Sequence, residues 1–200
     1  MSYIRKIFFN IFLIFLVIVN ITNISFAGND KAAETFILNL SAEALKIIQS
    51  KDSEQTKMKL LEDKFNTSVD VNWMAKFAMA KFWKSMTDKQ KEDYLKAYNH
   101  YLIKTYVPRF KEYNNEEIKI TGTKDMGNEQ YIVSTQITSK KSADKHTLNI
   151  GYRCKNTDGS FKIRDISGED MSLLTTQRSE FASVVTNGGL DKLIQTLAEK

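Results

Sequence analysis

The sequence has few of the residues on which disulfide, metal and phosphate chemistry depend. Cys154 is its single cysteine, so no disulfide can form within the chain. The two histidines, His100 and His146, have no carboxylate or second histidine at helical spacing, which argues against a metal site. No glycine-rich phosphate loop, GxSxG elbow or HExxH motif occurs. We therefore expect no metal or cofactor, two solvated histidines, and a cysteine packed into the core.

The N-terminal end has the three parts of a secretory signal peptide. Arg5 and Lys6 give a positive start, residues 7–19 are almost all apolar, and small residues stand where signal peptidase requires them. The continuous apolar run is shorter than the roughly 20 residues that span a bilayer. An uncleaved membrane anchor is the alternative. We expect residues 1–27 to be removed after export to the periplasm, and residues 28–200 to form one domain.

The charge balance does not favour binding to nucleic acid. The formal net charge is +5, and loss of the two N-terminal cations would lower it by two, to +3. Lysines are spread along the whole chain, as on an ordinary solvated surface. Nucleic-acid binding would require a basic patch, so we expect no such partner.

Helical periodicity dominates the first half. Apolar residues recur at steps of three and four from Ala33 to Ile48, which predicts an amphipathic helix that begins near Asn29 or Asp30. A shorter helix carrying Met58, Leu61 and Phe65 follows in the predicted order. Residues 71–83 are apolar around most of the circumference, so we expect this next helix to be largely enclosed.

A further helix carries an unusual stripe of tyrosines. Thr87 and Gln90 have the spacing of a capping box, which predicts a helix start, and the only proline, Pro108, predicts a bend or an end. A tyrosine packs its ring in apolar surroundings while its hydroxyl needs a polar partner. The stripe therefore suggests a boundary between the core and a wetter space, although a helix half buried against a sheet explains it equally well. Its members are Tyr94, Tyr98, Tyr101 and Tyr106.

From Ile118 onward the apolar period changes to two, which predicts strands. Short turns separate these runs, so neighbouring strands should be antiparallel and form a meander of about four. After a loop over residues 167–172, two helices close the chain, separated by Gly188 and Gly189. The predicted fold is α+β, with helices packed on one face of a curved antiparallel sheet.

Catalysis has one candidate residue. Asp165, at the end of a strand, could act as a base facing a pocket lined by Tyr152 and another tyrosine, as in isomerase-like folds with a cone-shaped sheet. An ion pair or a capping role explains Asp165 equally well. We expect the protein not to be an enzyme.

Several segments together resemble the MlaC family of periplasmic phospholipid-binding proteins, also called the toluene-tolerance family. The resemblance covers most of residues 36–200 and is carried by residues 69–83, 90–106, 151–153, 161–166, 172–173, 178–181 and 189–194. Four positions depart from the family pattern. Ala80 and Asp170 stand where the family usually has glycine, Phe161 where it has tryptophan, and Gln177 where it often has tyrosine.

The resemblance implies a lipid carrier that maintains outer-membrane asymmetry. Such proteins ferry phospholipid, as cargo, between an outer-membrane lipoprotein–porin complex and an inner-membrane ABC transporter with an MCE-domain subunit. The fold it implies, similar to NTF2-like folds, encloses an apolar cavity for the lipid tails, and we expect a monomer. The alternative is a periplasmic interaction module without ligand, in which the same residues form a dry core. The residues predicted to bind lipid are Trp73, Phe77, Tyr98, Tyr101, Leu102, Tyr106, Tyr131, Val133, Ile150, Tyr152, Met171 and Leu173.

Overall fold

The computed structural model describes residues 26–112, 117–138 and 147–200. The predicted signal peptide therefore lies almost entirely outside the described residues, as does His146. The helices and strands follow one another as α2 (Phe26–Gln49), α3 (Glu54–Ser68), α4 (Val71–Met79), the 3-10 helix η1 (Ala80–Ser85), α5 (Asp88–Tyr106), the 3-10 helix η2 (Val107–Glu112), β1 (Glu117–Asp125), β2 (Gln130–Thr138), β3 (Thr147–Thr157), β4 (Ser160–Gly168), β5 (Met171–Ser172), α6 (Leu173–Gly188) and α7 (Leu190–Ala198).

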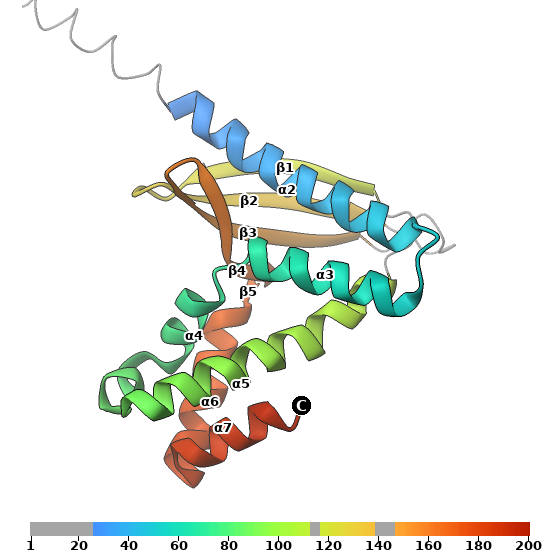
Figure 1. Ribbon diagram of the computed structural model, residues 1–200. Helices are drawn as coiled ribbons and strands as arrows, with labels where there is room; N and C mark the ends of the chain where they lie inside the picture. The colour runs from blue at the N-terminus through green and yellow to red at the C-terminus, as the bar shows by residue number, and fades with distance from the viewer. Residues whose placement is uncertain (1–25, 113–116, 139–146) are drawn as a thin grey trace, which may run out of the picture.

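The sheet is an antiparallel meander in which each strand pairs with the next one along the chain (Figure 1). Its order, β1-β2-β3-β4-β5, includes one strand more than the expected four. The extra strand forms where a loop was predicted. Glu169 and Asp170 have positive φ values of 46° and 65°, and this tight turn folds β5 back onto β4.

The helices form two groups, which refines the predicted arrangement. Helix α2 runs along the sheet in contact with β1, β2 and β3, and α3 contacts β4 (Figure 1). Helices α4, α5, α6 and α7 pack on one another beyond the β4–β5 side of the sheet. The predicted α+β fold with helices against an antiparallel sheet is confirmed, but only α2 and α3 lie along the sheet.

Three helix boundaries test the sequence signals. The capping box is confirmed, because Thr87 Oγ1 accepts from the Gln90 backbone N–H and the Gln90 side chain accepts from the Thr87 backbone N–H. Helix α5 ends at Tyr106 and continues as the 3-10 helix that contains Pro108. The predicted start of the first helix is wrong: Asn29 and Asp30 lie inside α2, which begins at Phe26.

The predicted helix over residues 71–83 is also wrong in part, because α4 ends at Met79. Ala80 has φ 46° and ψ −119°, close to the first central residue of a type II′ turn, where glycine is favoured. Its backbone N–H donates to the carbonyl groups of Lys76 and Phe77, which closes the helix. A 3-10 helix then carries Phe82 and Trp83.

Ala80→Gly is expected to raise the free energy of unfolding by about 1 kcal/mol. Glycine removes the cost of the left-handed backbone, which is roughly 1–3 kcal/mol. Part of this gain is offset because glycine also gives the unfolded chain more conformational entropy. Chemical denaturation of the variant and the wild type measures the difference. Ala42→Gly, in the exposed middle of α2, is the matched control and should lower the same quantity by about 1 kcal/mol. Equal losses in both variants would contradict the strain at Ala80.

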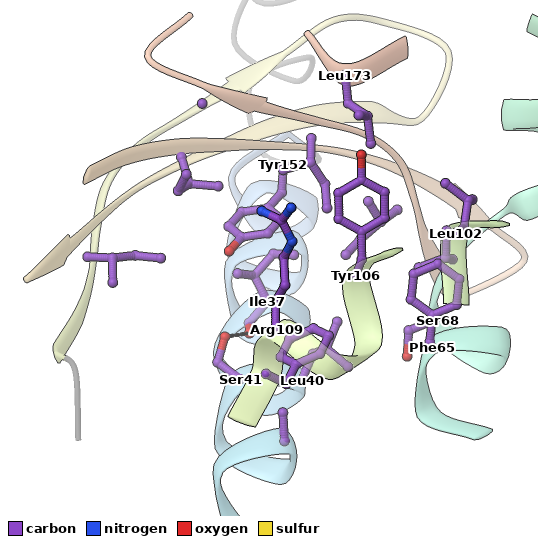
Figure 2. A pocket seen from close by; sticks show the side chains of 18 of the residues that line it. Ile37, Leu40, Ser41, Phe65, Ser68, Leu102, Tyr106, Arg109, Tyr152 and Leu173 are labelled. Atoms are coloured by element: carbon purple, nitrogen blue, oxygen red, sulfur yellow. Dashed lines mark hydrogen bonds between the residues drawn. The ribbon is translucent and has the colours of Figure 1, made fainter. Parts of the chain in front are cut away.

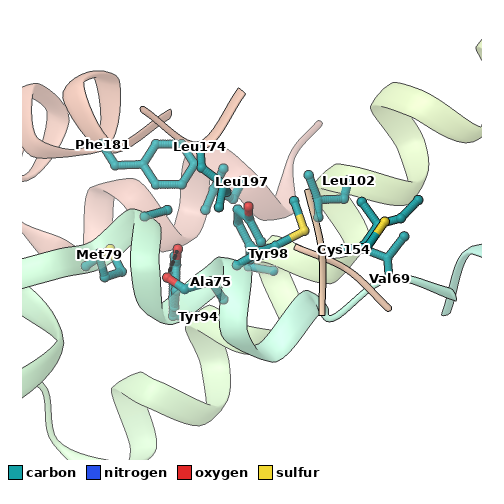
Figure 3. Packing of buried hydrophobic residues seen from close by; sticks show 14 of the residues in the cluster. Val69, Ala75, Met79, Tyr94, Tyr98, Leu102, Cys154, Leu174, Phe181 and Leu197 are labelled. Carbon is teal, nitrogen blue, oxygen red and sulfur yellow. Dashed lines mark hydrogen bonds between the residues drawn. The ribbon is translucent and has the colours of Figure 1, made fainter. Parts of the chain in front are cut away.

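Half of the tyrosine stripe belongs to the solid core between α4, α5 and α6 (Figure 3). Tyr94 and Tyr98 are both 0% exposed. The Tyr94 hydroxyl donates to the Ala75 carbonyl at 3.1 Å, and the Tyr98 hydroxyl donates to Gln177 Oε1 at 2.7 Å. Burial raises the pKa of both phenols well above their usual range. These rings stabilise the helical group, with each hydroxyl satisfied by a neighbour.

Candidate functional site

A cavity of about 710 Å³ lies between the sheet and the helices α2 and α3 (Figure 2). This volume falls within the range of about 300–1,000 Å³ that is typical of ligand pockets. Its walls are mostly aliphatic, and the principal apolar side chains are Ile37, Leu40, Leu61, Phe65, Leu102, Ile137, Ile150, Ile163, Ile166 and Leu173.

The periodicity of the chain places these side chains. Ile37, Leu40, Ser41 and Ala44 recur along one face of α2, because three- and four-residue steps align side chains on a helix. Across the cavity, alternate residues of β3 point to the same face of the sheet. Leu148, Ile150 and Tyr152 therefore form the opposite wall.

Two lining residues are unusually exposed for apolar side chains. Leu148, at the start of β3, is 53% exposed, and Met171, in β5, is 73% exposed. Both line the cavity, so they mark where it meets solvent. The cavity is therefore open to the surface at a rim that is itself apolar.

Six of the twelve residues predicted to bind lipid lie around this cavity: Leu102, Tyr106, Ile150, Tyr152, Met171 and Leu173. They come from α5, β3, β5 and α6, so the tertiary structure brings together four separate segments. Their contact with lipid stays a prediction. Burial raises the pKa of the Tyr106 and Tyr152 phenols to about 12, so both are neutral near pH 7.

The other six predicted residues lie elsewhere. Tyr98 and Tyr101 pack against Phe181, with ring centroids 6.0 and 6.5 Å away. Tyr131 packs on Phe161 at 6.0 Å, and Val133 is 0% exposed. None of these four side chains lines the cavity.

Trp73 and Phe77 are half-buried and contact each other and two arginine side chains. Their rings stack at 5.2 Å, and the guanidinium groups of Arg164 and Arg178 lie over them, 4.9 Å from Trp73 and 5.3 Å from Phe77. Arg164 also pairs with Asp70 at 2.9 Å. These contacts fix α4 against β4 and α6, away from the cavity.

Sequence reasoning missed the contribution of α2, α3 and η2. The apolar stripe of α2 predicts only an amphipathic helix. The cavity residues absent from the predicted site are Ile37, Leu40, Leu61, Phe65 and Phe110. A 3.6-residue period shows that a helix face is apolar. It does not distinguish a face that meets side chains from one that meets a cavity.

Comparison with known proteins identifies the family of this chain. Residues 38–199 match the family described as MlaC protein. The chain belongs to the MlaC family. Over 170 residues it is 21% identical to the intermembrane phospholipid transport system binding protein MlaC of Haemophilus influenzae, with 84% of this chain and 78% of that protein covered.

The fold of a solved structure agrees. A phospholipid-binding protein from Ralstonia solanacearum, solved in complex with a phospholipid, aligns with a TM-score of 0.68 and 19% identity. The alignment covers 85% of this chain and 94% of that one. At this identity the likeness establishes the fold.

Three of the positions that depart from the MlaC pattern have a structural explanation. Ala80 and Asp170, where the family usually has glycine, both have positive φ values, so these sites need the conformation that glycine adopts most easily. Gln177 is 1% exposed and accepts the hydrogen bond of Tyr98. The glutamine thus places a polar contact in the core.

Asp165 has a structural role in this MlaC fold. Its carboxylate accepts hydrogen bonds from the backbone N–H groups of Ile166 and Leu174 at 2.9 and 3.1 Å, and from Ser172 Oγ at 2.6 Å. It does not line the cavity. The carboxylate therefore joins β4 to the first turn of α6.

The remaining reactive groups offer little chemistry. Cys154 is 0% exposed, which confirms its predicted place in the core, and burial raises the pKa of its thiol to about 12. His100 is exposed, as predicted. Within residues 26–112, 117–138 and 147–200, no three histidine, cysteine or acidic side chains gather as a metal site would require. In the same ranges, no helix is both long and apolar enough to cross a membrane.

Proposed function

We propose that this protein is a periplasmic carrier that holds the acyl chains of a phospholipid in the cavity. The observation that carries the proposal is the aliphatic wall formed by α2, α3 and β3, which opens at an apolar rim. The named phospholipid proteins in the same family and with the same fold support it. The mostly apolar lining matches the chemistry of a hydrocarbon chain.

The hydrophobic effect explains how such a cavity can both take and release lipid. Each methylene removed from water contributes about 0.8 kcal/mol, so a sixteen-carbon tail is stabilised by roughly 12 kcal/mol relative to water. A tail that leaves a bilayer for an apolar cavity moves between two dry environments. Its transfer free energy is therefore small, and the direction of transport must come from the partners.

The partners we propose are membrane complexes on both sides of the periplasm. They are an outer-membrane lipoprotein–porin complex and an inner-membrane ABC transporter with an MCE-domain subunit, in keeping with the transport-system name of the Haemophilus relative. Residues 1–27, the signal peptide that the sequence predicts, would be cleaved after export.

Native mass spectrometry of protein purified from a periplasmic extract tests the function. We expect a complex heavier than the mature chain by the mass of one or more phospholipids, and denaturing extraction should identify them. Delipidated protein should take up phospholipid again from vesicles. A purified protein that carries no lipid and acquires none from vesicles would instead support an interaction module without ligand.

A further inference from the structure

Among the residues that the structure describes, the cavity wall carries two charged side chains, and both are cationic. They are Lys64 of α3 and Arg109 of η2, and no acidic residue lines the cavity. A charge beside a cavity for hydrocarbon is costly unless it is solvated or paired. Each of the two cations therefore needs water or a negatively charged partner.

Lys64 already has its partner. Its Nζ lies 2.7 Å from Glu43 Oε2, an ion pair that joins α3 to α2. The pair neutralises both charges and holds two walls of the cavity together. Lys64 is therefore a structural contact whose charge is already neutralised.

Arg109 has no such partner. In the part of the chain that the structure describes, its one hydrogen bond is from Nε to the Thr105 carbonyl at 3.2 Å, and no carboxylate lies within ion-pair distance. That bond orients the side chain and leaves both terminal nitrogens free. Figure 2 shows the guanidinium group pointing into the cavity. The residue as a whole is exposed, so water also reaches this side chain.

We propose that Arg109 binds the phosphate of the lipid whose tails fill the cavity, a proposal that rests on the function proposed above. A guanidinium group presents N–H donors in a planar fork that matches the oxygens of a phosphate, and such charge-assisted hydrogen bonds are strong. The tails fit the aliphatic wall, and the phosphate supplies a negative charge, which no side chain of the described cavity wall carries. The protein thus selects phosphate-bearing lipids over neutral lipids with the same tails.

A competition between two lipids with identical acyl chains isolates this contact. Delipidated protein is mixed with micelles of an uncharged sugar detergent that contain equal amounts of phosphatidylglycerol and diacylglycerol, and the lipids bound after re-isolation are quantified by mass spectrometry. We expect Arg109→Gln to lower the bound ratio of phosphatidylglycerol to diacylglycerol about tenfold relative to wild type. Arg109→Lys should keep part of the preference. Lys104→Gln removes a cation at an exposed position of α5 outside the cavity lining, so it should keep the wild-type ratio.

The outcomes separate the two proposals. Equal ratios for wild type and Arg109→Gln would overturn the phosphate assignment while leaving the carrier function intact. A wild-type protein that takes up neither lipid would overturn the function itself. If the ratios are equal and titration calorimetry detects binding of inorganic phosphate by wild type alone, the arginine serves a free phosphate ion, which also overturns the assignment to lipid.

Discussion

Ile150→Arg is expected to produce a folded protein that retains at least about a hundredfold less phospholipid than wild type. Ile150 lies on the cavity face of β3, paired with Thr135 of β2 and Gly168 of β4. The longer side chain would occupy the space of a lipid tail and bring a charge into an apolar wall, which costs several kcal/mol. Because the side chain can extend its charged end towards the open rim, we expect the fold to survive. Mass spectrometry of bound lipid and circular dichroism measure the two effects.

Ser134→Arg is the matched control for the charge. Ser134 lies beside Thr135 on β2, so its side chain points to the other face of the sheet, and its strand partners are Gly122 and Gly151. This variant should bind lipid as wild type does. Undiminished lipid in a natively folded Ile150→Arg protein would mean that the tails do not lie against β3.

Asp165→Ala is expected to lower the free energy of unfolding by about 3 kcal/mol. The carboxylate accepts three hydrogen bonds, two from backbone N–H groups and one from Ser172 Oγ. Hydrogen bonds to a charged group contribute about 1.5–3 kcal/mol each, and loss of a helix cap costs about 1 kcal/mol, although these terms are not additive. For a domain of this size, such a loss lowers the melting temperature by roughly 6–12 °C.

Two further variants distinguish a structural carboxylate from a catalytic one. Asp165→Asn keeps an acceptor oxygen, so it should lose less stability than Asp165→Ala. Glu180→Ala, at an exposed position of α6, should change stability little. Unchanged stability in Asp165→Ala, together with a turnover that depends on Asp165, would favour the isomerase-like alternative.

Local sequence signals predicted those elements whose determinants lie within a few residues of one another. The capping box at Thr87 and Gln90 and the break at Gly188 and Gly189 formed where the sequence predicts them. The helix end at Ala80 was not predicted, because alanine is a good helix former and its left-handed backbone is imposed by the surrounding packing. The strand β5 was missed for a similar reason, since two residues give no period.

The candidate site was only half predicted from the sequence. Tyrosines at positions 98, 101 and 131 have the same local pattern as those at 106 and 152, yet only the latter two reach the cavity. Phe181 of α6 packs against Tyr98 and Tyr101, and Phe161 of β4 packs against Tyr131, whereas Tyr106 and Tyr152 border the cavity. No spacing along the chain encodes that division.

The sequence by itself determined that this protein has amphipathic helices and an antiparallel meander, because periodicity is a local property. The sequence also contains the segments whose resemblance to the MlaC family predicted its membership. The tertiary structure alone decided that a cavity exists, which side chains line it, and that Arg109 is the cation there without a carboxylate partner among the described residues. The physical reason is that an apolar face has the same pattern whether it is covered by side chains or by open space. Only the packing of residues distant in the chain distinguishes the two.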